Sequence, residues 1–255
     1  DKCEIIWASD IVKDPAYWEK VINIAKNTTI ARATRCLTIM GRNEDEAMET
    51  AQLFYPMMQV ADIFHLNVNV CQLGMDQRKA NMLAREVGEK IGYWKPSAVH
   101  HHIMAGLKGP SRMDVEGKSS TGNEFEDKMS KSKKGSAIFI HDPPDVVRKK
   151  IKDAHCVAGE VKNNPILEIA KYIIFRRMDV LEIKRKPKFG GDVQYENYEE
   201  LEEAFLHPKA SKGIHPLDLK FGIADALNEL LAPVQEFFDK HEEYMEVFDE
   251  EKVTR

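Results

Sequence analysis

The segment from residue 68 to residue 104 limits the fold more than any other part of the chain. Residues 68–73 predict a strand that ends at Gly74. Residues 76–91 place their apolar side chains near one stripe and predict a helix. Residues 98–104 then predict a second strand. Strands separated by a helix normally pair in parallel, with helices on the faces of the sheet, so we expect an α/β domain here.

The rest of the chain predicts two halves of different character. Strands are also expected at residues 4–8 and 137–140. Helices are expected at residues 16–40 with a break near 27–29, and at 43–64, 165–177, 198–206 and 216–248. Asp142 is expected to cap a further helix with Pro143 at its first position. Because strand signals fade after about residue 144, we expect an α/β domain over residues 1–143 and an all-helical domain over residues 144–255.

The composition predicts a chain with a substantial core and no membrane segment. Of the 255 residues, 43% are hydrophobic, which suffices for one large domain or two modest ones. No apolar run reaches about 18 residues, so no membrane span is expected. No basic and apolar leader opens the chain. The cysteines are far apart and predict reduced thiols in a cytoplasmic protein; they are Cys3, Cys36, Cys71 and Cys156.

The charge is unevenly distributed along the chain. The net charge is −5, yet residues 128–188 hold sixteen Lys or Arg against seven Asp or Glu. Seven acidic residues and one lysine lie between Asp239 and Glu251. A basic middle in an acidic protein is a plausible surface for phosphates. From the charge alone, ordinary solvated helix faces are the favoured explanation.

Lysine and serine alternate in a loop between two expected strands. The residues are Lys128, Ser130, Lys131 and Ser132. Each ammonium offers a mobile charge and each hydroxyl a donor, which suits a polyphosphate. Taken alone, the run is as well explained by a solvated loop.

A polar stripe crosses an apolar helix at residues 54–63. Tyr55, Gln59 and Asp62 are spaced i, i+4 and i+7 and project from one helix face. Polar groups on such a helix need internal partners or a ligand, and the spacing alone does not decide between these. Pro56 is expected to kink the helix near the stripe.

These segments together resemble one enzyme family. Residues 128–132 match the second signature motif of class I aminoacyl-tRNA synthetases, where it holds the phosphates of ATP. Residues 55–63 and 74–79 are similar to the tyrosine-site segments of archaeal and eukaryotic tyrosyl-tRNA synthetases. The resemblance implies that Tyr55, Gln59 and Gln77 hold the α-amino end of tyrosine and that Asp62 accepts a hydrogen bond from its phenol. The related tryptophanyl enzymes are not expected to need this set.

Two further tetrapeptides resemble the anticodon-reading segments of the same family. They are residues 189–192, which begin with Phe189, and residues 215–218, which contain His215 and Asp218. Without the family, a turn and a helix cap explain both. The resemblance implies that Phe189 stacks on the first anticodon base, a guanine, and that His215 and Asp218 read its edge. Lysines and Arg185 at residues 184–188 precede Phe189, where backbone phosphates would lie, and Arg78 is a weaker candidate for the acceptor end.

Three successive histidines, residues 100–102, invite a metal interpretation. Neighbours on a strand face opposite sides and cannot all bind one ion. No carboxylate or cysteine stands at the usual ligand spacing. We therefore expect no protein metal site.

The resemblance predicts a fold, a reaction and a missing N-terminal segment. It implies the C-terminal part of a Rossmann-like catalytic domain with an anticodon-binding domain after it, ATP as substrate with Mg²⁺ as its counter-ion, and tyrosine and tyrosine tRNA as partners. A homodimer or pseudo-dimer is implied by analogy. The family's His-Ile-Gly-His type motif and first strands would precede Asp1, so this polypeptide is not expected to fold by itself. The family pattern does not account for residues 111–127 or for the acidic tail.

Three explanations of that gap stay open. The chain is a fragment of a normal enzyme, which we favour, or one half of a split or duplicated synthetase completed by a second segment. Alternatively, it is an inactive paralogue that acts as a tRNA-binding or interaction module.

Overall fold

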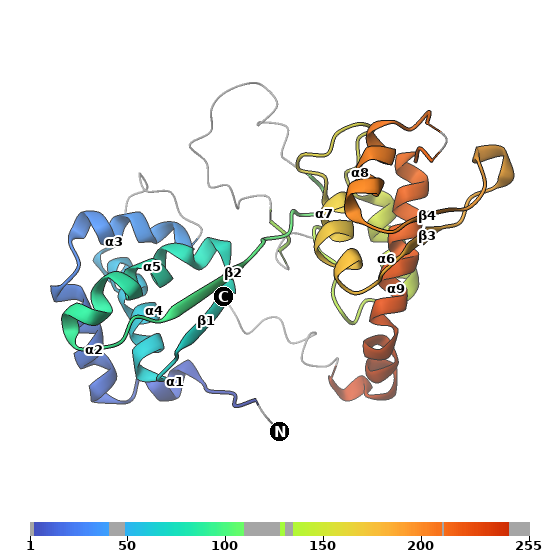
Figure 1. Cartoon of the computed structure of the whole chain (residues 1–255). Coiled ribbons are helices and arrows are strands. Elements are labelled where there is room, and N and C mark those ends of the chain that lie inside the picture. Colours follow the sequence, from blue (N-terminus) through green and yellow to red (C-terminus); the bar gives the residue numbers. More distant parts are fainter. Residues whose placement is uncertain (1–2, 41–48, 110–127, 131–134, 211, 245–255) are drawn as a thin grey trace. The chain divides into compact units, whose positions relative to one another are not determined.

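The computed structural model describes residues 3–40, 49–109, 128–130, 135–210 and 212–244 (Figure 1). These residues divide into two compact units, one ending at Ile103 and the other beginning at Met104. The division falls earlier than the expected boundary at residues 143 and 144. The reason is packing, because Leu107 belongs to the core of the second unit and Met129 and Ile138 pack against that core.

Helices make up most of the first unit. They are α1 (Ala8–Ile11), α2 (Pro15–Lys26), α3 (Ile30–Cys36), η1 (Leu37–Met40), η2 (Thr50–Leu53), α4 (Phe54–His65), η3 (Met75–Gln77), α5 (Arg78–Val87) and η4 (Gly88–Ile91). The expected break near residues 27–29 is confirmed, because the Thr29 hydroxyl accepts from Arg32 N and starts a new helix. The helix start expected near residue 43 lies outside the described residues. Pro56 falls in the first turn of α4, where its missing N–H loses no helical bond, and α4 continues through it.

The strand expected at residues 4–8 does not form. Residues 3–7 have no regular structure, and α1 begins at Ala8. The side chains of Ile5 and Trp7 are 81% and 70% exposed. No described strand pairs with this segment, and an unpaired strand leaves its backbone groups and apolar side chains in water.

The parallel strand pair is confirmed. Strand β1 (Val70–Gly74) pairs in parallel with β2 (Ser97–His101), with Val70 opposite Ser97 and Gly74 opposite His101. Helix α5 crosses between them, as the sequence predicts. Helix α4 packs against α2 and α5, and buried side chains from these helices form the core: Tyr17, Val21, Ile24, Val60, Phe64 and Leu83.

The second unit is mostly helical, but not entirely. Its helices are α6 (Pro144–Asp153), α7 (Pro165–Tyr172), η6 (Ile174–Arg176), η7 (Pro187–Phe189), α8 (Tyr198–Leu206), α9 (Pro216–Lys240) and η8 (Glu242–Tyr244). Strands β3 (Leu181–Ile183) and β4 (Val193–Tyr195) form an antiparallel pair that the all-helical prediction left out. Gly222 lets α9 approach β3, because a Cβ there would lie 2.5 Å from Cγ1 of Ile183.

The strand expected at residues 137–140 is also wrong. The chain turns there, with Asp142 N donating to Phe139 O at 3.0 Å. The Asp142 carboxylate accepts from Phe139 N at 2.8 Å and pairs with Lys150 at 2.5 Å. Asp142 therefore closes the turn rather than capping a helix, and Pro143 takes the cap position of α6 one residue later.

Candidate functional site

A cavity of about 620 Å³ lies in the first unit and brings the polar stripe of α4 together with the end of β1. Tyr55, Gln59 and Asp62 line it from one face of α4, and Gln77 lines it from η3. The remaining lining is largely apolar and includes Met58, Ile63, Val70 and Leu73. An apolar cavity with a few converging polar groups is typical of a small-molecule site.

A tyrosine from α2 holds the carboxylate of Asp62. The Tyr17 hydroxyl donates to Oδ1 of Asp62 at 2.8 Å and also approaches Met58 O at 3.1 Å. Burial raises the pKa of Asp62, although the bond from Tyr17 and the nearby His65 lower it in part. Burial, followed by the hydrogen bond to Asp62, also raises the pKa of Tyr17. The hydroxyl therefore stays a donor, and the carboxylate keeps acceptor capacity for a second hydroxyl.

The two glutamines form a chain of hydrogen bonds along another wall of the cavity. Nε2 of Gln59 donates to Oε1 of Gln77 at 3.1 Å, and Nε2 of Gln77 donates to Ile39 O at 3.2 Å. Oε1 of Gln59 is buried and has no hydrogen-bond partner among the described residues. A buried acceptor of this kind favours a ligand that brings a donor, such as an ammonium group.

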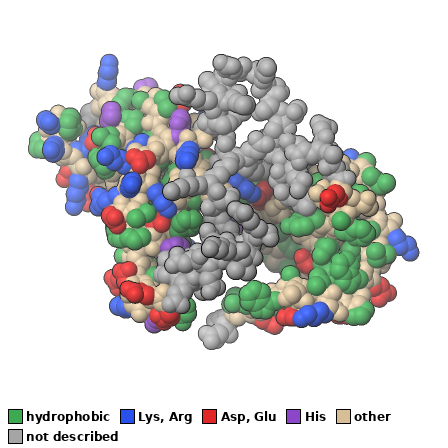
Figure 2. All heavy atoms as spheres, turned by 180° about the vertical axis from the view of Figure 1, so that it is seen from behind, with side chains coloured by type: hydrophobic (Ala, Val, Ile, Leu, Met, Phe, Trp, Pro, Cys, Tyr) green, Lys and Arg blue, Asp and Glu red, His purple; other side chains and the backbone are tan. Residues whose placement is uncertain are grey.

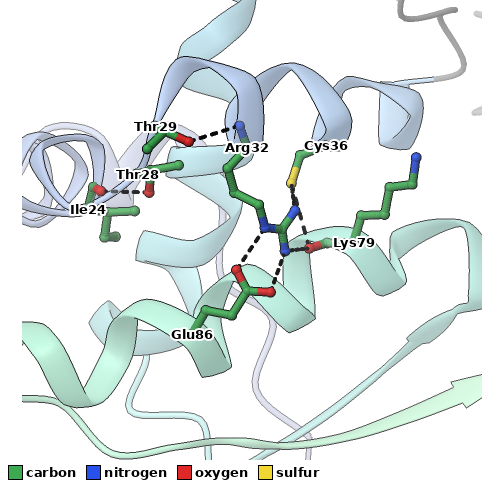
Figure 3. A network of polar contacts seen from close by, with 7 residues as sticks. All are labelled: Ile24, Thr28, Thr29, Arg32, Cys36, Lys79 and Glu86. Atoms are coloured by element: carbon green, nitrogen blue, oxygen red, sulfur yellow. Dashed lines mark hydrogen bonds and ion pairs between the residues drawn. The ribbon is translucent and has the colours of Figure 1, made fainter.

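An arginine network joins α3 to the beginning of α5, two residues after Gln77 (Figure 3). Arg32 on α3 makes two bonds to Glu86 on α5, from Nε at 2.7 Å and from Nη2 at 2.9 Å. Arg32 also donates to Sγ of Cys36 at 2.9 Å and to Lys79 O at 3.4 Å. The bond from Arg32 lowers the pKa of Glu86, and burial raises the pKa of Cys36. The network ties α3 to α5, and Ile39, whose carbonyl accepts from Gln77, lies in η1, the short helix that follows α3.

The lysine and serine loop is described only in part. Lys128 forms an isolated antiparallel bridge with Ala105, and Met129 N donates to Met104 O at 2.9 Å. Ser130 O accepts from the Ser136 hydroxyl at 2.7 Å. Lys131 and Ser132 lie outside the described residues. The described part therefore shows how the entry to the loop is anchored within the second unit.

The Phe189 segment presents a ring to solvent. Phe189 ends η7 with 56% of its surface exposed, and Nζ of Lys188 lies 4.8 Å from the ring centre. Gly190 and Gly191 have φ values of 100° and 70°, a conformation that glycine adopts without strain. Lys and Arg side chains are frequent on the face of this unit seen in Figure 2. The ring is therefore available for stacking.

The His215 segment begins a helix, as the turn-and-cap interpretation states. Nδ1 of His215 accepts from Leu217 N at 3.1 Å and caps α9. Asp218 lies in the first turn of α9 and is half-buried. Capping uses one ring nitrogen of His215 and leaves the second ring nitrogen for other contacts. Arg78, the weaker RNA candidate, is the exposed first residue of α5 and does not line the cavity.

The histidine run begins at the end of β2 and extends one residue beyond it. Nε2 of His100 lies 3.0 Å from Nδ2 of Asn81, whereas His101 and His102 are exposed. Burial, followed by the charge of Arg78, lowers the pKa of His100. Within the described ranges, no three His, Cys, Asp or Glu side chains stand close enough to hold a metal ion. In the same ranges, no helix is long and apolar enough to cross a membrane.

Sequence reasoning missed three residues of this arrangement. Tyr17 lies on the buried stripe of α2 with Val21 and Ile24, where it resembles any core aromatic residue. Arg32 and Glu86 are 54 positions apart, so no local pattern connects them. The glutamine at position 77 was found only through the family resemblance.

Comparison with known proteins shows the family of the chain. The family model described as "tRNA synthetases class I (W and Y)" matches residues 1–232. A tyrosine–tRNA ligase of Thermococcus sibiricus is 47% identical over 270 residues, covering 100% of this chain and 70% of the relative. The chain therefore belongs to the class I tRNA synthetases of the tryptophan and tyrosine family, and within it to the archaeal type of tyrosyl-tRNA synthetase.

Solved structures show the same relationship. The tyrosyl-tRNA synthetase of Pyrococcus horikoshii, solved with L-tyrosine, is 44% identical with a TM-score of 0.86, covering 98% of this chain and 69% of that one. A Leishmania major tyrosyl-tRNA synthetase in complex with tyrosinol is 35% identical with a TM-score of 0.77, covering 99% of this chain and 36% of that one. The tryptophanyl enzyme of Aeropyrum pernix is 18% identical with a TM-score of 0.57, covering 89% and 56%, and shares the fold alone.

Proposed function

We propose that the protein attaches tyrosine to tyrosine tRNA in two steps. The tyrosine carboxylate attacks the α-phosphate of ATP, and pyrophosphate leaves as tyrosyl-adenylate forms. A terminal ribose hydroxyl of the tRNA then attacks the tyrosyl carbonyl, and AMP leaves. ATP is the nucleotide substrate of this family, and the closely matching relatives are tyrosine–tRNA ligases.

One observation carries the choice of tyrosine: a half-buried carboxylate and a buried hydroxyl meet in an apolar cavity. Asp62 keeps acceptor capacity after binding the Tyr17 hydroxyl at 2.8 Å. A phenol entering the cavity would donate to Asp62, whereas the ring of phenylalanine would leave the carboxylate without that partner. Leaving a buried polar group unpaired costs more than losing an apolar contact, so such a site discriminates strongly; tyrosyl-tRNA synthetases are themselves the standard example of this effect.

The cavity wall formed by Gln59 and Gln77 is assigned to the amino end of tyrosine. Tyr55, Gln59 and Gln77 line the same cavity as Asp62. Oε1 of Gln59, buried and without a partner among the described residues, suits an ammonium donor. The substrate would thus be held at both ends, which orients its carboxylate for reaction.

The lysine and serine loop is assigned to ATP. Lys128 and Lys131 stabilise the departing pyrophosphate, with Ser130 and Ser132 as supporting donors. Mg²⁺ would arrive with the phosphates, because it keeps most of its waters and needs few protein ligands.

The second unit is assigned to the anticodon. Phe189 offers the exposed ring for stacking, and His215 and Asp218 offer polar groups at the start of α9. Arg78 is assigned to the acceptor end of the tRNA. We place the enzyme in the cytoplasm because aminoacylated tRNA is consumed by translation, and we propose a homodimer, the commonest closed assembly of soluble oligomers.

The test is tyrosine-dependent exchange of pyrophosphate into ATP by the complete protein, with any sequence that its gene encodes before Asp1. Lys131→Ala should abolish most exchange, and unchanged exchange would remove the loop from catalysis. The second candidate function, a tRNA-binding module without catalysis, predicts tRNA binding with no exchange in the wild type. Asp218→Ala tests the anticodon assignment separately from catalysis, because it should reduce the preference for guanine at the first anticodon position.

A further inference from the structure

One arginine joins the two segments assigned to the anticodon. Arg185 follows β3 in the loop that carries Phe189. Its backbone N donates to Oδ1 of Asp192 at 2.8 Å, and its Nε donates to Gly191 O at 2.8 Å. Its Nη1 donates to Gly213 O, also at 2.8 Å, two residues before His215. A single planar side chain therefore bonds the Phe189 loop and the segment that leads into α9.

The receiving segment is tightly held on its other side. Gly213 is buried, and a Cβ added there would lie 2.4 Å from His207 O. The hydroxyl of Tyr195, a buried residue of β4, donates to Lys212 O at 2.7 Å. Two successive carbonyls, of residues 212 and 213, thus receive side-chain donors from the β3–β4 region. The start of α9 can move little relative to that hairpin while these bonds persist.

Charge places Asp218 in the same cluster. The pKa of Tyr195 is raised to about 12, first by burial, while Arg185 lowers it and Asp218 raises it. Both charged groups therefore act on one hydroxyl.

The donors of Arg185 face the protein, and this separates it from its neighbours. Lys184 and Lys186 are exposed, whereas Arg185 is half-buried with Nε and Nη1 committed to carbonyls. A guanidinium can hold two acceptors in a fixed geometry, but an ammonium is a point charge on a flexible stem. The structure thus distinguishes a positioning arginine from lysines suited to phosphate contacts.

We propose that Arg185 is a positioning residue that sets the spacing between Phe189 and the pair His215 and Asp218, and thereby the discrimination of the first anticodon base. The inference rests on the proposed function. Base reading needs its contact groups held within about 0.5 Å of a productive geometry, and two neutral carbonyls fixed by one rigid fork supply that constraint.

The test compares two variants of the complete protein that change different properties. Arg185→Lys keeps the charge and removes the fork, whereas Lys186→Gln removes a neighbouring charge and keeps the fork. Aminoacylation is measured with tyrosine tRNA transcripts carrying guanine or cytosine at the first anticodon position. Arg185→Lys should reduce the ratio of the two kcat/KM values about tenfold, the effect of losing one to two hydrogen bonds. Pyrophosphate exchange without tRNA should stay unchanged.

Lys186→Gln should instead weaken the binding of both transcripts equally and make that binding less sensitive to salt. An unchanged ratio in Arg185→Lys would overturn the proposal, whatever its effect on thermal stability. If Arg185→Lys does not fold, Asp192→Ala replaces it. This variant removes the bond to the Arg185 backbone and should also reduce the ratio of the two kcat/KM values. A wild type that shows exchange but no preference for guanine would overturn both this inference and the anticodon assignment, while leaving the catalytic assignment standing.

Discussion

The Tyr17 hydroxyl and the Asp62 carboxylate meet at 2.8 Å across 45 positions of sequence. Tyr17 comes from α2 and is 1% exposed, while Asp62 comes from α4 and lines the cavity. The bond fixes one oxygen of Asp62 and leaves acceptor capacity for a ligand. Substrate recognition at this end of the cavity therefore depends on a residue whose ring is part of the core.

Tyr17→Phe should raise KM for tyrosine roughly three- to tenfold in pyrophosphate exchange, with a smaller change in kcat. The ring stays in the core, but Asp62 loses the bond that orients it. Tyr93→Phe is a matched control, because Tyr93 stacks on Phe64 in the same unit and does not line the cavity. A Tyr17→Phe enzyme with unaltered KM would show that Asp62 needs no such support.

Asp62→Asn should stabilise the protein while impairing tyrosine activation. Burial raises the pKa of Asp62, so the folded state disfavours the charged form. Below the ordinary carboxyl pKa of about 3.9, the group is protonated in both folded and unfolded chains, so its charge does not contribute to the stability difference between wild type and variant. The stabilisation should appear as pH rises from there through the raised pKa, and should stay below about 1 kcal/mol. Urea unfolding at pH 4 and pH 7 measures this, and a larger gain at pH 4 would contradict it.

Glu86→Gln should loosen the wall that holds Gln77. The variant weakens the two bonds from Arg32, at a cost of about 0.5–1 kcal/mol because Glu86 is half exposed. The pKa of Glu86 is lowered, so the contribution of the ion pair is present above the ordinary value near 4.3 and is lost as pH falls through the lowered value. KM for tyrosine should rise two- to threefold. Exposed Glu89 on η4 supplies the control, and equal effects of Glu86→Gln and Glu89→Gln would exclude a role for the network.

Gly222→Ala should destabilise the second unit by about 1–3 kcal/mol, since the new methyl group would overlap Ile183. Combining it with Ile183→Val, which removes the terminal methyl group of that side chain, should recover part of the loss. Denaturant unfolding of the single and double variants measures the coupling. If the changes in the free energy of unfolding of the two single variants add exactly in the double variant, the two residues are not in contact.

Local signals predicted a large part of the first unit. Asp14 caps the start of α2, and Thr29 caps α3 at the expected break. The parallel pairing of β1 with β2 follows from the helix between them. The i, i+4, i+7 spacing correctly placed Tyr55, Gln59 and Asp62 on one helix face, because helix geometry alone decides it. The functional roles of these residues came from the resemblance and stay predictions.

The errors arise where partners decide the structure. Residues 4–8 and 137–140 have the apolar character of strands, but the structure describes no strand beside them for pairing. The β3–β4 pair consists of three residues on each side, too short for a periodic signal. Tyr17, Arg32 and Arg185 act through contacts with residues or backbone groups from other elements, which a single sequence does not encode as a pattern.

The most direct test of the central claim compares tyrosine with phenylalanine in pyrophosphate exchange, using the complete protein and its Asp62→Ala variant. If the α4 cavity recognises the phenol through Asp62, the wild type should strongly prefer tyrosine, and the variant should lose roughly 10- to 150-fold of that preference. Equal preference in the two enzymes would contradict the account, because the carboxylate would then not be the group that reads the substrate hydroxyl.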